Sequence, residues 1–221
     1  MKNYAIIVAG GTGSRMKGDI PKQFVLLNGK PVIVYSIEAF NNYDPDLQIL
    51  LVIHPDYIEY WNKLSVQYKF SVPYKVVNGG ETRFASVKNG LDSIETDGFV
   101  AIHDAARPLI DAGFIKQLFE QASVYGSAVP GIALNDTIRI LENNTSRQLD
   151  RMLLRAMQTP QVFKVTELKY AYLQAFQALF TDDASVMQSA GFQLHLTDGR
   201  LENIKITIQK DFAFAELMMK I

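Results

Sequence analysis

A glycine-rich run near the N-terminus contains the residues that most directly suggest chemistry. It reads Ala9-Gly10-Gly11-Thr12-Gly13-Ser14-Arg15-Met16 and follows a short apolar segment. Glycines after a strand let the backbone approach a ligand and turn its N–H groups towards phosphate oxygens. Two cations, Arg15 and Lys22, stand in and just after this run. Together they suit a reaction that builds negative charge on transferring phosphate groups, such as nucleotidyl transfer.

The run does not match two other glycine loops that bind nucleotides. A dinucleotide fingerprint starting at Gly11 requires glycine or alanine where this chain has Met16, which disfavours a dehydrogenase. The P-loop pattern is missing as well, because Gly29-Lys30 is followed by Pro31. A glycine turn with two nearby cations is, by itself, more typical of a surface turn, so its interpretation depends on the rest of the chain.

A second glycine pair precedes a helix-like stretch in the same half of the chain. Its polar and small residues are Gly79, Gly80, Arg83 and Ser86. Backbone groups in such a turn can hydrogen-bond the edge of a pyrimidine, and the Ser86 hydroxyl can contact a base or a ribose. An ordinary helix start, with Glu81 as a favourable acid in the first turn, explains the spacing equally well.

Asp104 directly follows the apolar segment 99–103. Ligands of open α/β sheets gather at the carboxyl ends of the strands. A carboxylate at that edge can hold Mg²⁺ between phosphate oxygens. We interpret the neighbouring His103 as a residue that orients the loop, since a lone histidine is weak evidence for a base or a metal ligand.

The first half of the chain alternates between short apolar segments and amphipathic ones, with a loop at 10–27. We expect strands at 4–9, 47–53, 74–77 and 99–103, and helices at 32–40, 56–68, 81–94 and 111–125. The segment 47–53 is apolar almost throughout, as in strands that are buried on both faces of a parallel sheet. This alternation predicts an α/β fold, a Rossmann-like three-layer sandwich with a mostly parallel central sheet.

The pattern changes after Pro130. Residues 137–141 alternate like a strand and a second segment returns through 149–157, so we expect a β-hairpin arm at about 135–157. Further helices are expected at 165–180, 183–190 and 211–219, and strands at 192–197 and 204–208. Thr181 is the expected cap of the helix at 183–190, and strand alternation puts Lys205 opposite its apolar neighbours. We expect one domain over residues 1–221.

Composition narrows the class of protein. The 221 residues are 48% hydrophobic and 20% charged, with a formal charge of −1 and no cysteine. These values are typical of a globular domain, and they exclude thiolate nucleophiles and zinc–cysteine sites. A near-zero charge argues against a nucleic-acid partner, and no apolar run approaches the roughly 20 residues of a membrane span. No signal peptide is recognisable, so we expect a cytoplasmic enzyme.

The motifs resemble, in order and over nearly the whole chain, those of the sugar-phosphate nucleotidyltransferases. The matching segments are Ala9–Met16, Pro21-Lys22-Gln23-Phe24, Gly79–Leu91, His103-Asp104-Ala105-Ala106-Arg107-Pro108, Asp136-Thr137, Arg151 with Gln158-Thr159-Pro160-Gln161, Thr181-Asp182-Asp183-Ala184 and Asn203-Ile204-Lys205-Ile206-Thr207. More narrowly, they are similar to the 2-C-methyl-D-erythritol 4-phosphate cytidylyltransferase family of the non-mevalonate isoprenoid pathway. One such match is weak, whereas the ordered set is very specific.

The resemblance implies a role for each matching residue. It implies catalytic roles for Arg15, Lys22, Arg151 and Lys205. It implies nucleotide binding by Ala9, Gly10, Gly11, Gly13, Gly79, Gly80, Arg83, Ser86, Asp104 and Ala105. It implies acceptor binding by Thr137, Arg151, Thr159, Thr181 and Lys205, and Mg²⁺ binding by Asp104 and Glu202. Relatives can carry aspartate at the position of Glu202, whose side chain is one methylene longer, so the second metal contact departs from the family pattern.

The implied reaction is transfer of CMP from CTP to a small polyol phosphate, by in-line attack of the acceptor phosphate. A homodimer formed through the arm is implied as well. A ribitol-5-phosphate cytidylyltransferase remains an alternative, although the Ala105-Ala106 pair favours the methylerythritol family because ribitol relatives tend to have serine and valine there. A non-catalytic nucleotide-binding module is a further alternative. Such a module is expected to lose Arg15, Lys22 or Asp104, and all three are present.

Overall fold

The central sheet organises the molecule. The computed structural model describes residues 2–11, 20–143 and 145–220. In this part of the chain a sheet of eight strands has the order β10-β7-β11-β6-β1-β4-β5, with β12 beside β7. The strands are β1 (Lys2–Ala9), β4 (Gln48–Ile53), β5 (Lys75–Asn78), β6 (Gly98–Asp104), β7 (Ser127–Ala133), β10 (Arg155–Met157), β11 (Gln161–Lys164) and β12 (Leu196–Asp198).

The sheet is mixed around a parallel core. Strands β6, β1, β4 and β5 are parallel neighbours. Strand β11 is antiparallel to both β6 and β7, and β10 is antiparallel to β7. The expected α/β sandwich with a parallel core is therefore confirmed.

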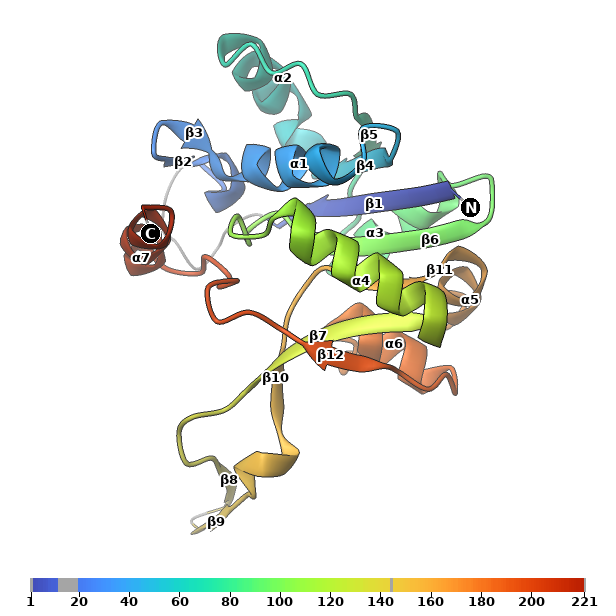
Figure 1. Ribbon diagram of the computed structural model, residues 1–221, viewed down its shortest axis with the longest axis vertical. Coiled ribbons are helices and arrows are strands. Elements are labelled where there is room, and N and C mark those ends of the chain that lie inside the picture. The colour runs from blue at the N-terminus through green and yellow to red at the C-terminus, as the bar shows by residue number, and fades with distance from the viewer. Residues whose placement is uncertain (1, 12–19, 144, 221) are drawn as a thin grey trace.

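Helices cover both faces of the sheet, which gives three layers (Figure 1). The helices are α1 (Val32–Tyr43), α2 (Ile58–Gln67), α3 (Arg83–Asp92), α4 (Ala112–Tyr125), α5 (Val165–Ala171), α6 (Asp183–Ser189) and α7 (Gln209–Met218). Alternate strand residues point to opposite faces. Ile7 of β1 accordingly packs with α1, α2 and α4, whereas Ile6 packs with α3, α5 and α6. Both isoleucines are fully buried, which explains why the core strands are apolar throughout.

A small third cluster attaches the C-terminal helix. Leu27 of the short ribbon β2 (Leu26–Leu27) and β3 (Lys30–Pro31) packs with Phe212 of α7 and with Ile206. Ile206 belongs to the segment 199–207, which we call the strap because it crosses from β12 to α7. The chain that carries Lys205 is thereby fixed beside the ribbon of β2 and β3.

The arm extends away from the sheet (Figure 1). It contains the hairpin β8 (Arg139–Glu142) and β9 (Thr145–Gln148), followed by the 3-10 helix Arg151–Leu153 and by β10. The hairpin predicted within 135–157 is confirmed. No helix in the described part of the chain is long and apolar enough to cross a membrane.

Two sequence expectations about elements are wrong, and strand β7 was missed. The helix expected at 165–180 ends at Ala171, because Tyr172 turns its side chain into the core and the following chain forms turns. Residues 204–208 form no strand, since the Ile206 amide donates to the Ala106 carbonyl and the Thr207 amide to the Asp211 carboxylate. Strand β7 was not expected, because Pro130 and Gly131 interrupt its pattern.

Candidate active site

A cavity of about 400 Å³ opens at the carboxyl edge of the parallel strands. The strand ends lie level, because Val8 of β1 is in register with Asp104 of β6, and Ala9 with Ile53 of β4. The lining residues are Val8, Ala9, Gly10, Gly11, Lys22, Gln23, His54, Gly80, Glu81, Thr82, Arg83, Ser86, Asp104, Ala105, Ala106, Lys205 and Thr207. The fold therefore brings together side chains from six separate chain segments, in a volume suited to a small ligand.

The turn before α3 is closed too tightly to accept side chains at its glycines. Thr82 caps the helix by accepting the Ala85 amide at 3.0 Å, and the Ser86 hydroxyl accepts the Gly80 amide at 3.0 Å. A Cβ atom on Gly80 would lie 2.5 Å from the Ala85 Cβ, and one on Gly10 would lie 2.9 Å from the Ser86 Oγ. The two glycine segments are thus packed edge to edge through Ser86, and both face the cavity.

Gln23 holds the start of the first glycine run. Its side chain is buried, and its amide nitrogen donates to the carbonyls of Ala9 at 2.8 Å and Gly11 at 3.0 Å. Gln23 belongs to the 3-10 helix Lys22–Phe24, so the same contact fixes Lys22 at the cavity wall. The predicted phosphate-binding residues Gly13 and Arg15 lie outside the described residues.

Asp104 is held between two cations. One oxygen, Oδ1, accepts from Arg83 Nε at 3.1 Å, and the other, Oδ2, accepts from Lys205 Nζ at 2.7 Å. Burial alone raises the pKa of Asp104, but Arg83 and then Lys205 outweigh it and hold this pKa far below its usual range. The carboxylate is therefore anionic, with Lys205 from the strap directly against it.

His103 and Thr159 support Asp104 from behind. Thr159 Oγ1 accepts the Asp104 amide at 3.1 Å and lies 3.2 Å from His103 Nδ1, while His103 Nε2 lies 3.1 Å from the Arg107 carbonyl. Burial lowers the pKa of His103 to about 3, so the ring is neutral. The carbonyl partner assigns its proton to Nε2. His103 orients the loop, as expected.

The strap is fastened mainly through its backbone. Gln158 Nε2 donates to the Arg200 carbonyl at 2.7 Å, and its Oε1 accepts the Arg200 amide at 3.0 Å. Arg107 donates to the Asn203 carbonyl at 2.7 Å, and Asn203 Nδ2 donates to the Thr159 carbonyl at 2.8 Å. These contacts fix the strap against the root of the arm, and with it the position of Lys205.

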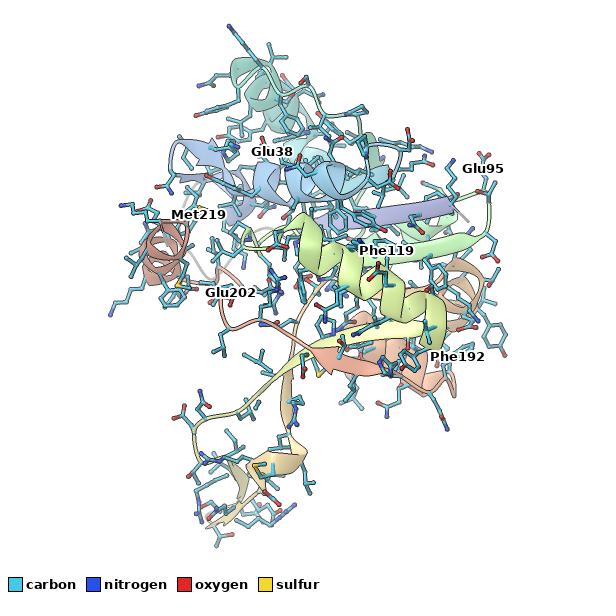
Figure 2. All side chains as sticks on the ribbon, viewed as in Figure 1. Glu38, Glu95, Phe119, Phe192, Glu202 and Met219 are labelled. Atoms are coloured by element: carbon cyan, nitrogen blue, oxygen red, sulfur yellow. The ribbon has the colours of Figure 1, made fainter. Side chains whose placement is uncertain are left out.

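Five predicted site residues do not line this cavity. Thr137 and Arg151 are exposed on the arm, where Arg151 donates to the Asn135 carbonyl. Thr159 is buried behind Asp104. Thr181 is exposed and does not cap α6, because Asp182 does so with a capping box that includes Ser185. Figure 2 shows Glu202 on the strap, and it is half-buried.

Gly79 also lies outside the lining, directly behind Gly80. A Cβ atom there would lie 3.2 Å from the Ile53 carbonyl oxygen, so a side chain would require the backbone at the end of β4 to shift by a few tenths of an ångström. Its amide donates to the same carbonyl at 2.7 Å. Gly79 therefore fixes the turn to the end of β4.

Several lining residues were not among the predicted site residues, and His54 and Thr207 are two of them. His54 directly follows β4, and the rule that ligands gather at strand ends could have identified it. Thr207 donates its amide and its hydroxyl to Asp211 at the start of α7. Thr207 ends the matching motif Asn203–Thr207, but the resemblance assigned a role in that motif to Lys205 and none to Thr207.

The residues around Asp104 fit Mg²⁺ bound together with a phosphate-bearing ligand. The described residues contain no group of three or more His, Cys, Asp or Glu side chains that could hold a metal by themselves. Mg²⁺ is usually bound through one or two carboxylates and the phosphates of a substrate. Asp104 offers one anionic carboxylate to the cavity, which is the minimum that such a shared site needs.

Comparisons with known proteins show the family of the chain. The family model of 2-C-methyl-D-erythritol 4-phosphate cytidylyltransferase (IspD) matches residues 3–221. The protein of that name from Bacteroides thetaiotaomicron is 43% identical over 219 residues, which is 99% of this chain and 100% of the relative.

Two solved structures with the same name have similar folds. The structure from Thermus thermophilus has a TM-score of 0.80 and 27% identity and covers 100% of both chains. The structure from Francisella tularensis has a TM-score of 0.81 and 30% identity and covers 98% of this chain and 99% of that one. The chain therefore belongs to the 2-C-methyl-D-erythritol 4-phosphate cytidylyltransferase family.

Proposed function

We propose that this enzyme transfers CMP from CTP to 2-C-methyl-D-erythritol 4-phosphate, giving 4-diphosphocytidyl-2-C-methyl-D-erythritol and pyrophosphate. The family match over almost the whole chain supports the reaction. The structural observation that carries the proposal is one cavity in which Lys22, Asp104 and Lys205 face the turn between Gly80 and Ser86. That turn is the proposed cytosine site, and the cations are the proposed phosphate site.

The proposed chemistry is a direct displacement at the α-phosphorus of CTP. An oxygen of the acceptor phosphate forms a bond to this phosphorus as the bond to the bridging oxygen breaks, and pyrophosphate leaves with the electron pair. The attacking phosphate is already an anion, so no protein nucleophile is required. Lys22 and Arg15 neutralise the charge that develops on the phosphates, and Lys205 aligns the acceptor phosphate for attack.

Mg²⁺ is part of the proposal. When bound, it supplies charge neutralisation on the phosphate oxygens. Asp104 would hold it through a carboxylate oxygen, and Lys205 would leave that oxygen for the acceptor phosphate. Glu202 stays a predicted second contact, and Thr159 and Thr181 stay predicted contacts of the acceptor.

The arm suggests how the site is completed. Thr137 and Arg151 are exposed on the arm and do not line the cavity of their own chain. We propose a homodimer in which the arm of each protomer brings these two residues to the cavity of the other. A single nucleotidyltransferase domain over 1–221 and a location in the cytoplasm belong to the same proposal.

The test is pyrophosphate release by the purified protein. The protein is incubated with CTP, Mg²⁺ and either methylerythritol phosphate or ribitol 5-phosphate. Release with methylerythritol phosphate alone is the expected result. Release with ribitol 5-phosphate alone would replace the acceptor and keep the mechanism, whereas release with neither from folded protein would leave a nucleotide-binding module.

A further inference from the structure

Arg83 binds two carboxylates through different nitrogens of its guanidinium. Its Nε donates to Asp104 Oδ1 at 3.1 Å, and its Nη1 and Nη2 donate to the two oxygens of Asp183 at 3.1 and 2.7 Å. The Asp183 side chain is fully buried, whereas Asp104 faces the cavity. The fork of the guanidinium is therefore turned away from the cavity and held by a residue that no ligand in the cavity touches.

Asp183 is itself fixed by neighbouring elements. The Tyr172 hydroxyl donates to Asp183 Oδ1 at 2.6 Å, and the Tyr172 ring stacks on Phe84 with centroids 4.5 Å apart. Gln161 of β11 accepts the Ala184 amide at 2.9 Å, which fixes the first turn of α6. Asp183 therefore has a defined position and three donors.

The charges in this network are stable. Burial lowers the pKa of Arg83, but Asp183 and then Asp104 outweigh it and raise this pKa well above its ordinary value. Burial and then Asp183 raise the pKa of Tyr172, so the phenol keeps its proton and remains a donor. Arg83 is thus a permanent cation whose position depends on where its two carboxylate partners lie.

This geometry decides how much of Asp104 the guanidinium covers. A guanidinium prefers to bind a carboxylate through two parallel N–H bonds. Here Asp183 takes that bidentate bond, so Arg83 reaches Asp104 with one nitrogen and one oxygen only. Oδ2 of Asp104 is left to a group on the cavity side, which in this structure is the ammonium of Lys205 on its flexible stem.

We propose that Asp183 is a positioning residue for the metal–nucleotide site: it restrains Arg83 so that one oxygen of Asp104 stays available to the cation that accompanies CTP. The inference rests on the proposed function. Without the charge of Asp183, the fork of Arg83 turns to Asp104, covers both oxygens and competes with the cation.

The readout is the dependence of CTP binding on Mg²⁺, measured without turnover. Isothermal titration calorimetry with CTP, in Mg²⁺ and in EDTA, gives two dissociation constants. The constant in EDTA divided by the constant in Mg²⁺ is the factor by which the cation strengthens CTP binding. We expect Asp183→Asn to reduce this ratio about 10- to 100-fold, as is typical for partners that orient metal ligands. Asp182→Asn is the matched control, because it removes a neighbouring charge that does not touch Arg83 and leaves a good helix cap.

A double variant separates the restraint of the Arg83 side chain from a general loss of protein stability. Arg83→Gln combined with Asp183→Asn removes the competing guanidinium, so we expect a ratio within about threefold of that of Arg83→Gln alone. A double variant whose ratio lies about 10-fold or more below that of Arg83→Gln would overturn the proposal, even where Asp183→Asn alone fails to fold. An unchanged ratio in folded Asp183→Asn protein would also overturn it, whatever happens to the melting temperature.

Different results would refute the proposed function and the proposed role of Asp183. Wild-type protein that binds no CTP would refute the proposed function and this inference together. Wild-type binding that is strengthened by Mg²⁺, with the same ratio in Asp183→Asn, would refute the inference alone.

Discussion

Lys22 is the cation whose removal tests the proposed chemistry most directly. It lines the cavity, and Gln23 beside it fixes the local backbone. Lys22→Ala is expected to lower kcat by about 10²- to 10³-fold, the usual cost of removing one group that stabilises transition-state charge. The melting temperature should change little, because the buried contacts of Gln23 remain.

The control for Lys22 is another lysine with a defined partner away from the cavity. Lys30 pairs with Glu38 at 2.6 Å and does not line the site. Lys30→Ala should keep near-normal kcat. Near-normal turnover in folded Lys22→Ala protein would count against the assigned role of Lys22.

His103 gives a prediction about acid stability. Its pKa is about 3 in the folded protein and about 6.5 in an unfolded chain. As pH falls, His103 therefore takes up a proton in the unfolded state before it does so in the folded state. The stability that depends on neutral His103 is complete above pH 6.5 and is lost as pH falls towards 3. Between pH 7 and 4.5 the free energy of unfolding should drop by about 3 kcal/mol because of His103.

The measurement is urea unfolding at a series of pH values in the presence of a chelator. His103→Gln should show a flatter slope over the same range, because glutamine does not titrate. An equal slope in both proteins would mean that His103 is not buried in its neutral form.

Individual residues were predictable where they share a local motif. Lys22, Asp104, Ser86 and Lys205 were identified with their neighbours, and the structure brings them to one cavity. The ion pair between Arg83 and Asp183 was not predicted, because Asp183 lies 100 positions further along the chain. No local spacing reports a contact between elements that meet only after folding.

At the scale of elements, the start of α6 carries a clear test. Asp182 accepts the Ser185 amide at 2.9 Å, whereas the sequence interpretation gave this role to Thr181. Asp182→Ala should cost about 1 kcal/mol of stability, the usual value for a lost N-cap. Thr181→Ala should cost less than about 0.5 kcal/mol, as for an exposed residue.

Chemical denaturation of the two variants measures this difference. Equal destabilisation would show that Thr181 shares the capping role. The pair also separates the stability of α6 from the effect of Asp183, because Asp183 keeps its contacts in both.

Elements with strong periodicity were predictable, and elements shaped by tertiary contacts were not. The strands of the parallel core were expected within a few residues of their observed bounds. The length of the helix expected at 165–180 was overestimated. Leu173 and Leu179 fit an apolar helix face in the sequence, but both are exposed in turns. Around 204–208, alternation placed Lys205 correctly on the face opposite Ile206, although bonds to Ala106 and Asp211 replace a strand ladder.

At the scale of the whole molecule, the proposed exchange of arms predicts complementation between two inactive variants. Lys22→Ala damages the cavity, and Arg151→Ala damages the arm. In a mixed dimer, one cavity has an intact Lys22 and receives an intact Arg151. Random mixing after subunit exchange should therefore restore about one quarter of wild-type activity.

Activity and sedimentation are measured on the same mixture. If each arm serves its own chain, the mixture stays inactive although dimers form. A monomeric wild-type protein would remove the basis of the proposed exchange. Sequence alone could suggest the arm but not its partner, because all residues of β8 and β9 are exposed on the single chain and none of them packs in its core.

The strap is held mostly by its main-chain atoms. Arg107 and Gln158 bind carbonyl oxygens of Arg200 and Asn203, which every amino acid supplies equally. Leu201 is exposed and Glu202 is half-buried between these anchors. These main-chain anchors leave the exposed side chain of Leu201 free to vary, whereas Asn203 and Ile206 are held by their own buried side chains. An engineer can therefore vary position 201 and keep the path of the strap, because the anchors on either side of it are carbonyl groups that any residue supplies.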